Sequence, residues 1–123
     1  MKNSLGFVTT TFLLSFSLIG IANAGDVDKR SLPLSGYGFA CQVINVSSSD
    51  ISIQIYLIPD GGGGTVKKGI IGPDEVTQNT SGPLSWTYSE YCRVQYVGRP
   101  GDIVATFCAL DEVGNCTVYV PMD

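Results

Sequence analysis

The sequence contains no histidine among its 123 residues, and charged residues make up only 15% of the chain. Without histidine, neither a Ser-His nor a Cys-His nucleophilic pair can be assembled. The cysteines form no Cys-x-x-Cys pair, so the usual zinc-binding patterns are missing as well. We therefore expect a protein that is not an enzyme and holds no cofactor, with a small secreted hydrolase as the alternative.

Helical patterning is also absent, since no stretch after residue 24 places apolar residues at helical spacing. Apolar and polar residues instead alternate with a period of two, and β-branched and aromatic residues dominate these runs. The sequence predicts about seven antiparallel strands, at residues 37–46, 51–58, 65–71, 75–80, 86–97, 102–110 and 115–120. A chain this short must fold them into two packed sheets. We expect an all-β, immunoglobulin-like β-sandwich, with a flattened β-barrel as the alternative.

The N-terminus has the features of a secretory signal peptide. A lysine supplies positive charge, residues 5–21 are mainly apolar, and Ala-Asn-Ala at 22–24 has the form of a cleavage site. We expect cleavage of residues 1–24, no stable membrane span afterwards, and a secreted or periplasmic bacterial protein. Residues 25–35 combine charge and a proline without alternation, which predicts a mobile arm before a sandwich domain at 36–123.

All four cysteines follow the predicted cleavage site, and an even number in an exported protein predicts two disulfides. Of the three possible pairings we favour Cys41 with Cys92 and Cys108 with Cys116. Chain entropy predicts a stabilisation of about 4 kcal/mol from the first bridge and about 2.5 kcal/mol from the second. A predicted hairpin at 98–101 leaves the pairing open, because a register shift by one residue sets Cys92 opposite Cys108.

Acidic residues outnumber basic ones. Without Lys2 of the predicted signal peptide, six Lys and Arg stand against eleven Asp and Glu, a net charge of −5. This balance repels phosphate backbones and anionic membranes, so we expect no nucleic-acid partner.

The stretch PDGGGGTVKKGIIG at residues 59–72 places four glycines before two lysines. A Walker-type phosphate loop needs Gly, four residues, then Gly-Lys and a hydroxyl at the start of a helix. Gly64 and Gly69 have this separation, but Ile70 and Ile71 follow where lysine and a hydroxyl are required. The stretch instead predicts a hairpin turn with positive φ, whose lysines protect an edge strand.

Three acidic turns give a candidate calcium site. If the strands alternate in direction, the turns at 47–50, 72–75 and 98–102 share one end of the sandwich. The carboxylates of these turns are the candidate ligands for calcium: Asp50, Asp74, Glu75 and Asp102. No spaced Asp-x-Asp loop is present, so ordinary turn chemistry is the simpler interpretation.

The aromatic-rich strand at 86–97 gives the candidate binding surface. If Cys92 points inward, an outward row contains side-chain types common in protein contacts and sugar platforms: Tyr91, Arg93 and Gln95. We expect a protein or glycan ligand of unknown identity, or else the inhibition of a secreted enzyme. The plainer interpretation is that the row only covers the sheet. Trp86 is expected in or near the core.

The stretch YCRVQYVGRPGDIVATFCALDEVGNC resembles the C-terminal half of small exported bacterial β-sandwich proteins. That group carries a Tyr-Cys-Arg strand, then a further Cys, and then Gly-x-Cys before a final strand. The resemblance covers mainly residues 88–120, with ACQVINV at 40–46 as additional support. It implies a β-sandwich and export, and it transfers no functional residues.

Overall fold

The computed structural model describes residues 25–122. Within this range the chain forms nine strands and one 3-10 helix: β2 (Asp26–Arg30), β3 (Leu34–Gly36), β4 (Gly38–Asn45), β5 (Ile51–Pro59), β6 (Thr65–Ile71), β7 (Val76–Ser81), β8 (Tyr88–Val97), η1 (Pro100–Asp102), β9 (Ile103–Leu110) and β10 (Cys116–Met122). None of the described residues forms a helix long and apolar enough to cross a membrane. The predicted signal peptide lies outside the described residues.

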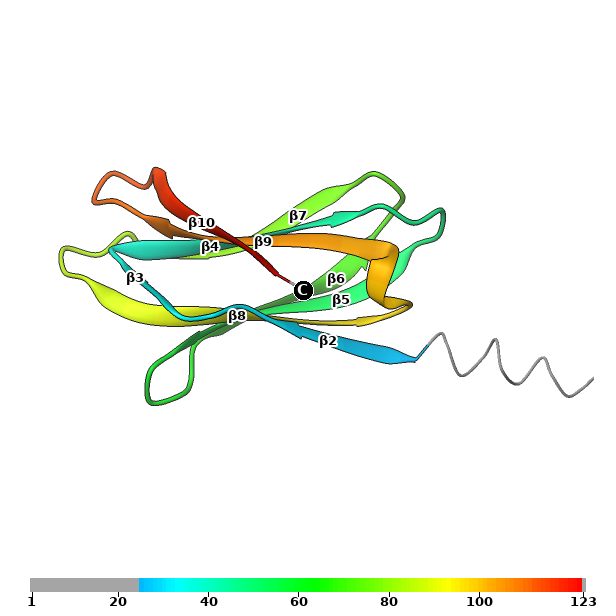
Figure 1. Ribbon diagram of the computed structural model, residues 1–123, viewed down its shortest axis with the longest axis horizontal. Helices are drawn as coiled ribbons and strands as arrows, with labels where there is room; N and C mark the ends of the chain where they lie inside the picture. The colour runs from blue at the N-terminus through cyan, green and yellow to red at the C-terminus, as the bar shows by residue number, and fades with distance from the viewer. Residues whose placement is uncertain (1–24, 123) are drawn as a thin grey trace, which may run out of the picture.

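The strands form two antiparallel sheets that pack face to face (Figure 1). One sheet has four strands in the order β10-β9-β4-β7. In the five-stranded sheet, β2 and β3 both pair with β8, and the order continues to β5 and β6. The sheets do not close on each other, so the predicted β-sandwich is confirmed and the flattened barrel is wrong. The seven predicted strands match β4 to β10 within two residues at each end.

The four central strands have the arrangement of the immunoglobulin core. β4 pairs with β7 in one sheet, and β5 pairs with β8 in the other. These pairs correspond to strands B with E and C with F of that fold. The outer strands differ, because C-terminal β9 and β10 extend the β4 side while N-terminal β2 and β3 extend the β8 side. The structure is therefore immunoglobulin-like at its centre only.

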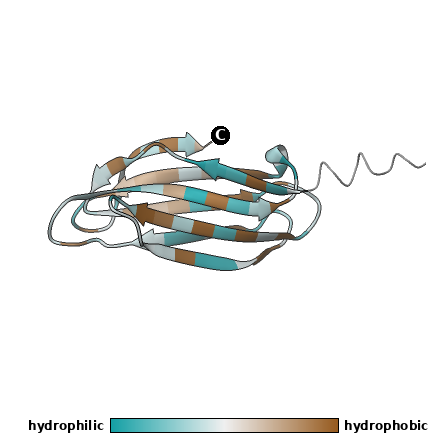
Figure 2. Cartoon of the chain, turned by 90° about the horizontal axis from the view of Figure 1, so that it is seen from below, coloured by the Kyte–Doolittle hydropathy of each residue, from teal (hydrophilic) through white to brown (hydrophobic). Residues whose placement is uncertain are grey.

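Alternate side chains of the central strands fill the space between the sheets, as the alternating hydropathy in Figure 2 illustrates. The buried set includes Phe39, Val43, Ile53, Ile55, Leu57, Val94, Ala105 and Phe107, each at most 2% exposed. Phe39 stacks on Phe107 with 5.5 Å between ring centroids. Truncation of such a side chain to alanine typically costs about 2 to 5 kcal/mol.

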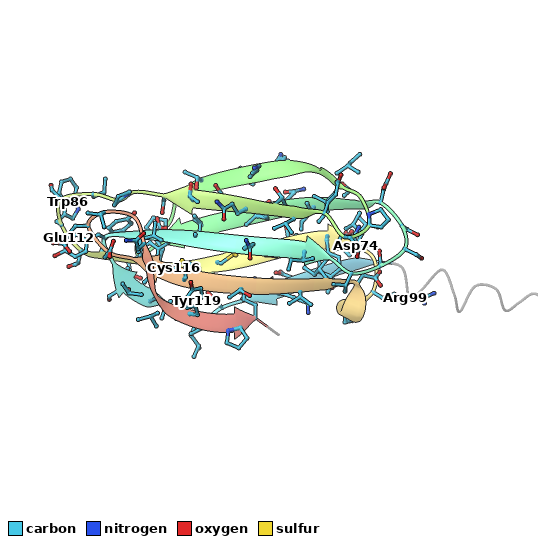
Figure 3. The ribbon with its side chains drawn as sticks, turned by 90° about the horizontal axis from the view of Figure 1, so that it is seen from above. Asp74, Trp86, Arg99, Glu112, Cys116 and Tyr119 are labelled. Carbon is cyan, nitrogen blue, oxygen red and sulfur yellow. A yellow bond between two sulfur atoms is a disulfide. The ribbon has the colours of Figure 1, made fainter. Side chains whose placement is uncertain are left out.

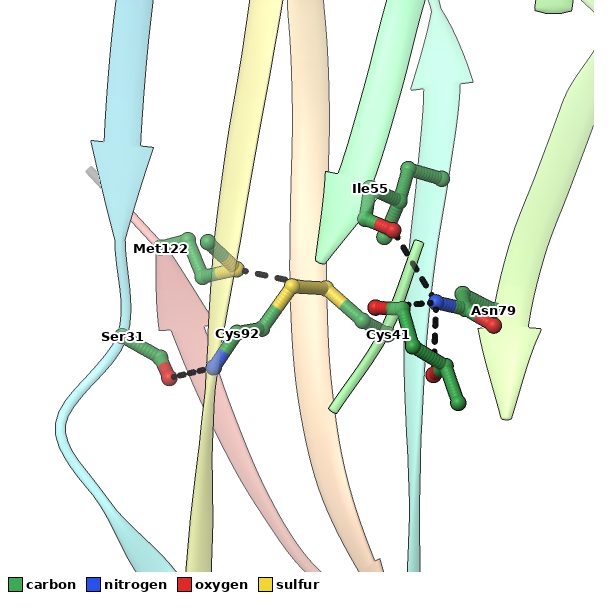
Figure 4. The surroundings of a disulfide bond; sticks show 7 residues. Ser31, Cys41, Ile55, Asn79, Cys92 and Met122 are labelled. Carbon is green, nitrogen blue, oxygen red and sulfur yellow. Dashed lines mark hydrogen bonds between the residues drawn. A yellow bond between two sulfur atoms is a disulfide. The ribbon is translucent and has the colours of Figure 1, made fainter. Parts of the chain in front are cut away.

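Both predicted disulfides form with the favoured pairing. Cys41 of β4 and Cys92 of β8 join the two sheets, with 6.2 Å between their Cα atoms and no exposed surface. Met122 Sδ lies 3.6 Å from Cys41 Sγ and covers this bridge (Figure 4). Cys108 and Cys116 join β9 to β10 within one sheet. Two disulfides indicate an oxidising environment outside the cytoplasm.

The glycine-rich stretch is the turn of the β5–β6 hairpin, as predicted. Gly61, Gly62, Gly63 and Gly64 all have positive φ angles, between 80° and 102°. A Cβ atom on Gly64 would stand 2.0 Å from the carbonyl oxygen of Leu57. Only glycine therefore fits where the second strand begins, and no helix follows the turn.

The segment predicted as a mobile arm, residues 25–35, instead contains β2 and the first two residues of β3, both paired with β8. Val27 and Leu34 pack against the core, and Asp28 binds Arg93 of β8. The missing alternation reflects an edge position, where each residue is at most half-buried.

The predicted hairpin at 98–101 is wrong, because β8 and β9 belong to different sheets. Asp102 Oδ2 accepts a hydrogen bond from the Arg99 amide, and the Tyr96 hydroxyl donates to the Arg99 carbonyl oxygen. These contacts hold η1 as a crossing between the sheets. β9 instead pairs with β4, where Cys41 lies opposite Phe107.

Candidate functional site

The candidate row on β8 faces outward, as predicted, because the alternate residues Cys92 and Val94 are buried. Tyr91, Arg93 and Gln95 are nevertheless only half-exposed. Arg93 donates from Nη2 to Asp28 Oδ2 at 2.9 Å, and its Nε also bonds to that carboxylate. The Arg93 guanidinium stands 5.7 Å from the ring centroid of Tyr56. Much of the bonding capacity of Arg93 is therefore used within the sheet.

The ion pair fixes the protonation states of its two members. The hydrogen bond from Arg93 lowers the pKa of Asp28, although partial burial opposes the shift. The same bond raises the pKa of Arg93. Both groups stay charged at neutral pH, and the pair ties edge strand β2 to the centre of its sheet.

The three acidic turns meet at one end of the sandwich, as predicted. The Val46 amide donates to the Asp102 carbonyl oxygen at 2.9 Å, and the Asn45 amide donates to the Glu75 carbonyl oxygen at 3.0 Å. The buried Asn45 side chain holds the turns together by donating to the Ser49 and Ile71 carbonyl oxygens. A hollow of about 400 Å³ lies at this end and includes Asp50 and Asp102 in its lining.

Two of the four candidate carboxylates at this end, Glu75 and Asp102, already have backbone partners. Glu75 Oε1 accepts from the Gly72 amide at 2.6 Å, and Asp102 Oδ2 accepts from the Arg99 amide at 2.9 Å. Across residues 25–122 no group of three or more acidic, cysteine or histidine side chains is arranged to hold a metal ion. The three turns thus come together, and the carboxylates of Glu75 and Asp102 stabilise the turns themselves.

Trp86 lies on the loop between β7 and β8 and is 61% exposed, so the expected core position is wrong. β8 begins only at Tyr88, whose ring packs edge-on against Phe39 with 5.1 Å between centroids. Tyr88 therefore makes the aromatic contact with the core that was expected of Trp86. The Leu84 amide donates to the Tyr37 carbonyl oxygen at 2.7 Å and anchors the loop.

Glu90 is a buried carboxylate beneath this loop, with only 5% of its surface exposed. Ser81 Oγ of β7 donates to Glu90 Oε1 at 2.6 Å, and the Tyr88 hydroxyl donates to Ser81 Oγ at 3.2 Å. Burial raises the pKa of Glu90, and the bond from Ser81 partly offsets the shift. The three side chains link the two sheets near the Trp86 loop.

The four-stranded sheet contains no charged residue in any of its strands. Every charged side chain among residues 25–122 belongs to a connection or to a strand of the other sheet. Figure 3 looks onto this sheet and shows Asp74, Arg99 and Glu112 at its ends, while Tyr119 and Cys116 lie on β10. The sheet is therefore neutral inside an acidic protein.

Three cross-strand rows make up the outer surface of this sheet, which we name the neutral face. The first two rows cross β10, β9, β4 and β7, and the third crosses β9, β4 and β7: Tyr119, Cys108, Ala40 and Thr80; Pro121, Thr106, Gln42 and Gln78; and Val104, Ile44 and Val76. Tyr119 is 65% exposed, and Val76 and Val104 are each 52% exposed. The neutral face thus combines exposed apolar groups with amides and hydroxyls.

A hollow of about 160 Å³ crosses the neutral face. Small side chains form its floor, and taller ones border it: Ala40, Gln42, Gln78, Thr106, Cys108, Cys116 and Tyr119. The Cys108–Cys116 disulfide therefore lies within the face as well as bracing β9 against β10.

Sequence reasoning missed the neutral face. The alternation predicted which side chains of each strand point outward, and the absence of charge is visible in each strand separately. What the pattern does not contain is the strand order, which places four uncharged strands side by side. Apart from Glu75 and Asp102, which stand at the first positions of two predicted strands, the lack of charge in the four segments was the signal that could have suggested it.

The fold and surfaces define a disulfide-linked, immunoglobulin-like β-sandwich with one uncharged sheet face. Comparisons of the chain with known protein families, curated proteins and solved structures find no match. Known proteins therefore supply neither a ligand nor functional residues for this chain.

Proposed function

We propose that this protein is an exported, non-enzymatic module that binds another protein through the neutral face. The observation that carries the proposal is the absence of charge from an entire sheet whose outer side chains are partly exposed. The centres of protein interfaces are depleted of charged residues and enriched in tyrosine. Solvated protein surfaces, by contrast, normally intersperse charges of both signs.

Location supports the same proposal. The two disulfides fit a secreted or periplasmic protein. The sandwich is a rigid scaffold, because the Cys41–Cys92 bridge and the apolar core fix the two sheets against each other. A rigid face loses little conformational entropy when it binds.

The row Tyr91, Arg93 and Gln95 is a weaker binding surface. A ligand that used Arg93 would have to compete with Asp28, and the intramolecular pair is already formed. The exposed side chains of the neutral face have no such ionic competitors.

A glycan ligand is the second candidate, and the exposed indole of Trp86 favours it. Aromatic rings at an exposed loop present an apolar face together with a polar edge. Binding of neutral sugars that is lost in Trp86→Ala and kept in neutral-face variants would support this candidate over the first.

Site-specific photo-cross-linking in the exporting cells tests the proposal. A photoreactive residue at Gln42 or Gln78 should yield protein adducts, because both positions lie in the neutral face. Ser52, exposed on the outer side of β5, is the control position and should yield none. Absence of adducts at both test positions, or equal adducts at Ser52, would contradict the proposal. A hydrolase panel on the same protein tests the alternative of an enzyme.

A further inference from the structure

We infer that the partner at the neutral face is a second copy of the same chain, stacked face to face about a two-fold axis. This inference rests on the proposed function and names its partner. It is carried by the chemistry of the face, by its shape and by the charge of the whole chain.

Charge selects which surface two identical copies can share. Each copy carries a net charge of −5 after the predicted cleavage, so the copies repel each other at long range. A charged side chain near a two-fold axis meets its own like charge in the partner. The neutral face is the one sheet surface among the described residues where this repulsion is absent.

The polar groups of the neutral face can pair with themselves. Gln42 and Gln78 are neighbours across β4 and β7, and Thr106 lies beside Gln42 on β9. Amide and hydroxyl side chains each carry both a donor and an acceptor. Two identical rows of such groups can therefore satisfy each other, whereas a row of carboxylates or ammonium groups cannot.

The shape of the face is also self-complementary. Tyr119 projects from β10 at 65% exposure, directly beside the hollow of about 160 Å³ over Ala40 and Cys108. In an isologous contact the projection of the first copy meets the hollow of the second, and the projection of the second copy meets the hollow of the first. The Tyr119 ring of each copy would enter the hollow of the other.

The size of the face predicts a weak dimer. Four strands about 4.8 Å apart and three rows about 7 Å apart bury on the order of 500 Å² per copy. Stable specific interfaces bury about 800 Å² per partner. We therefore expect a concentration-dependent equilibrium in place of a permanent dimer.

Sedimentation velocity of the exported, disulfide-intact chain tests the inference. Between about 10 μM and about 1 mM, the concentration range in which small interfaces associate, the sedimentation coefficient should move from monomer to dimer. Added salt should strengthen association modestly, because it screens the repulsion between the two acidic copies and no ion pairs form the contact.

Matched glutamine variants locate the contact. Gln42→Glu and Gln78→Glu keep the side-chain shape but place like charges across the axis, so each should weaken association by at least about 10-fold. Gln54→Glu is the control, because Gln54 lies on the outer side of β5 and accepts a hydrogen bond from Tyr56 that a glutamate also accepts. This control should dimerise like the parent chain.

The outcomes separate the inference from the proposed function. A monomer throughout the concentration range, or equal weakening by Gln54→Glu, overturns self-association. If Gln42 and Gln78 then cross-link to a different protein, the proposed function survives without it. Cross-linked adducts with twice the mass of the chain support both statements, and the absence of dimer and adducts overturns both.

Discussion

The guanidinium of Arg93 holds the carboxylate of Asp28 through both Nε and Nη2, across 65 residues of sequence. Asp28 belongs to edge strand β2, and Arg93 belongs to the central strand β8. The pair therefore attaches the N-terminal strand to the sandwich, which gives a residue from the candidate binding row a structural role.

Arg93→Ala should loosen β2 with little effect on the rest of the fold. We expect only a small loss in the free energy of unfolding, because exposed ion pairs contribute little. Amide hydrogen exchange of residues 26–30 should accelerate, while exchange in β5 stays unchanged. Arg30→Ala is the control, since Arg30 stands 3.5 Å from Asp28 and is more exposed. Equal acceleration in both variants would contradict the role given to Arg93.

The buried carboxyl of Glu90 should make stability depend on pH. Its pKa is raised in the folded state by burial, so the folded protein binds the proton more tightly than the unfolded chain does. This contribution is fully present below the unfolded pKa and is lost as the pH rises through the folded pKa. Glu90→Gln should therefore raise the melting temperature at pH 7 and change it less at pH 4.

The variant Ser81→Ala is the control for Glu90→Gln in the pH prediction. Ser81→Ala removes the donor to Glu90 Oε1 and should destabilise the protein at pH 7 by about 1.5 to 3 kcal/mol, the usual value for a bond to a charged group. Melting curves of both variants from pH 4 to 8 provide the measurement. A Glu90→Gln protein that is less stable than the parent chain at pH 7 would refute the argument.

Trp86 is the single tryptophan of the chain, which makes its exposure measurable by fluorescence. We expect emission close to that of free tryptophan and strong quenching by acrylamide in the folded protein. Trp86→Ala should change the free energy of unfolding by no more than about 0.5 kcal/mol, as for other surface substitutions. Blue-shifted, unquenched emission would mean that the loop buries the indole.

Strand positions were predictable because burial on one face imposes a period of two on the sequence. Ile51, Ile53, Ile55 and Leu57 alternate with more exposed residues, and the same period appears in every central strand. These positions depend on local pattern, which a single sequence contains. The pairing of Cys41 with Cys92 was the favoured one of three and stayed open, because it depends on the register of distant strands.

Features set by contacts between distant residues were not predictable. β2 has no alternation of its own, and its place depends on Val27 and Asp28 meeting groups on other strands. Trp86 and Tyr88 are two residues apart, so the period of two assigns both to the same side of a strand. Only Tyr88 contacts Phe39. The neutral face depends on strand order in the same way. Sequence periodicity identifies a side of a strand but not the neighbour of that strand.

Calcium should leave the thermal stability of the protein unchanged. Glu75 and Asp102 already accept backbone amide protons, so binding a cation would cost these hydrogen bonds. Calorimetric titration and melting curves at millimolar calcium provide the measurement. A rise in melting temperature that Asp102→Asn abolishes would instead support the calcium hypothesis.

Mild reductant should open the Cys108–Cys116 disulfide before the Cys41–Cys92 disulfide. Thiol attack requires access to a sulfur atom. Cys116 is half-exposed on the sheet surface, whereas Cys41 and Cys92 have no exposed surface. Alkylation at increasing dithiothreitol, followed by peptide mapping, should label Cys108 and Cys116 in a protein that is still folded. Cys41 and Cys92 should react only as the fold opens, because both are fully buried. Their reduction then removes about 4 kcal/mol of loop-closure stabilisation. Labelling of Cys41 while circular dichroism still reports the native sheets would show that the two sheets separate without global unfolding.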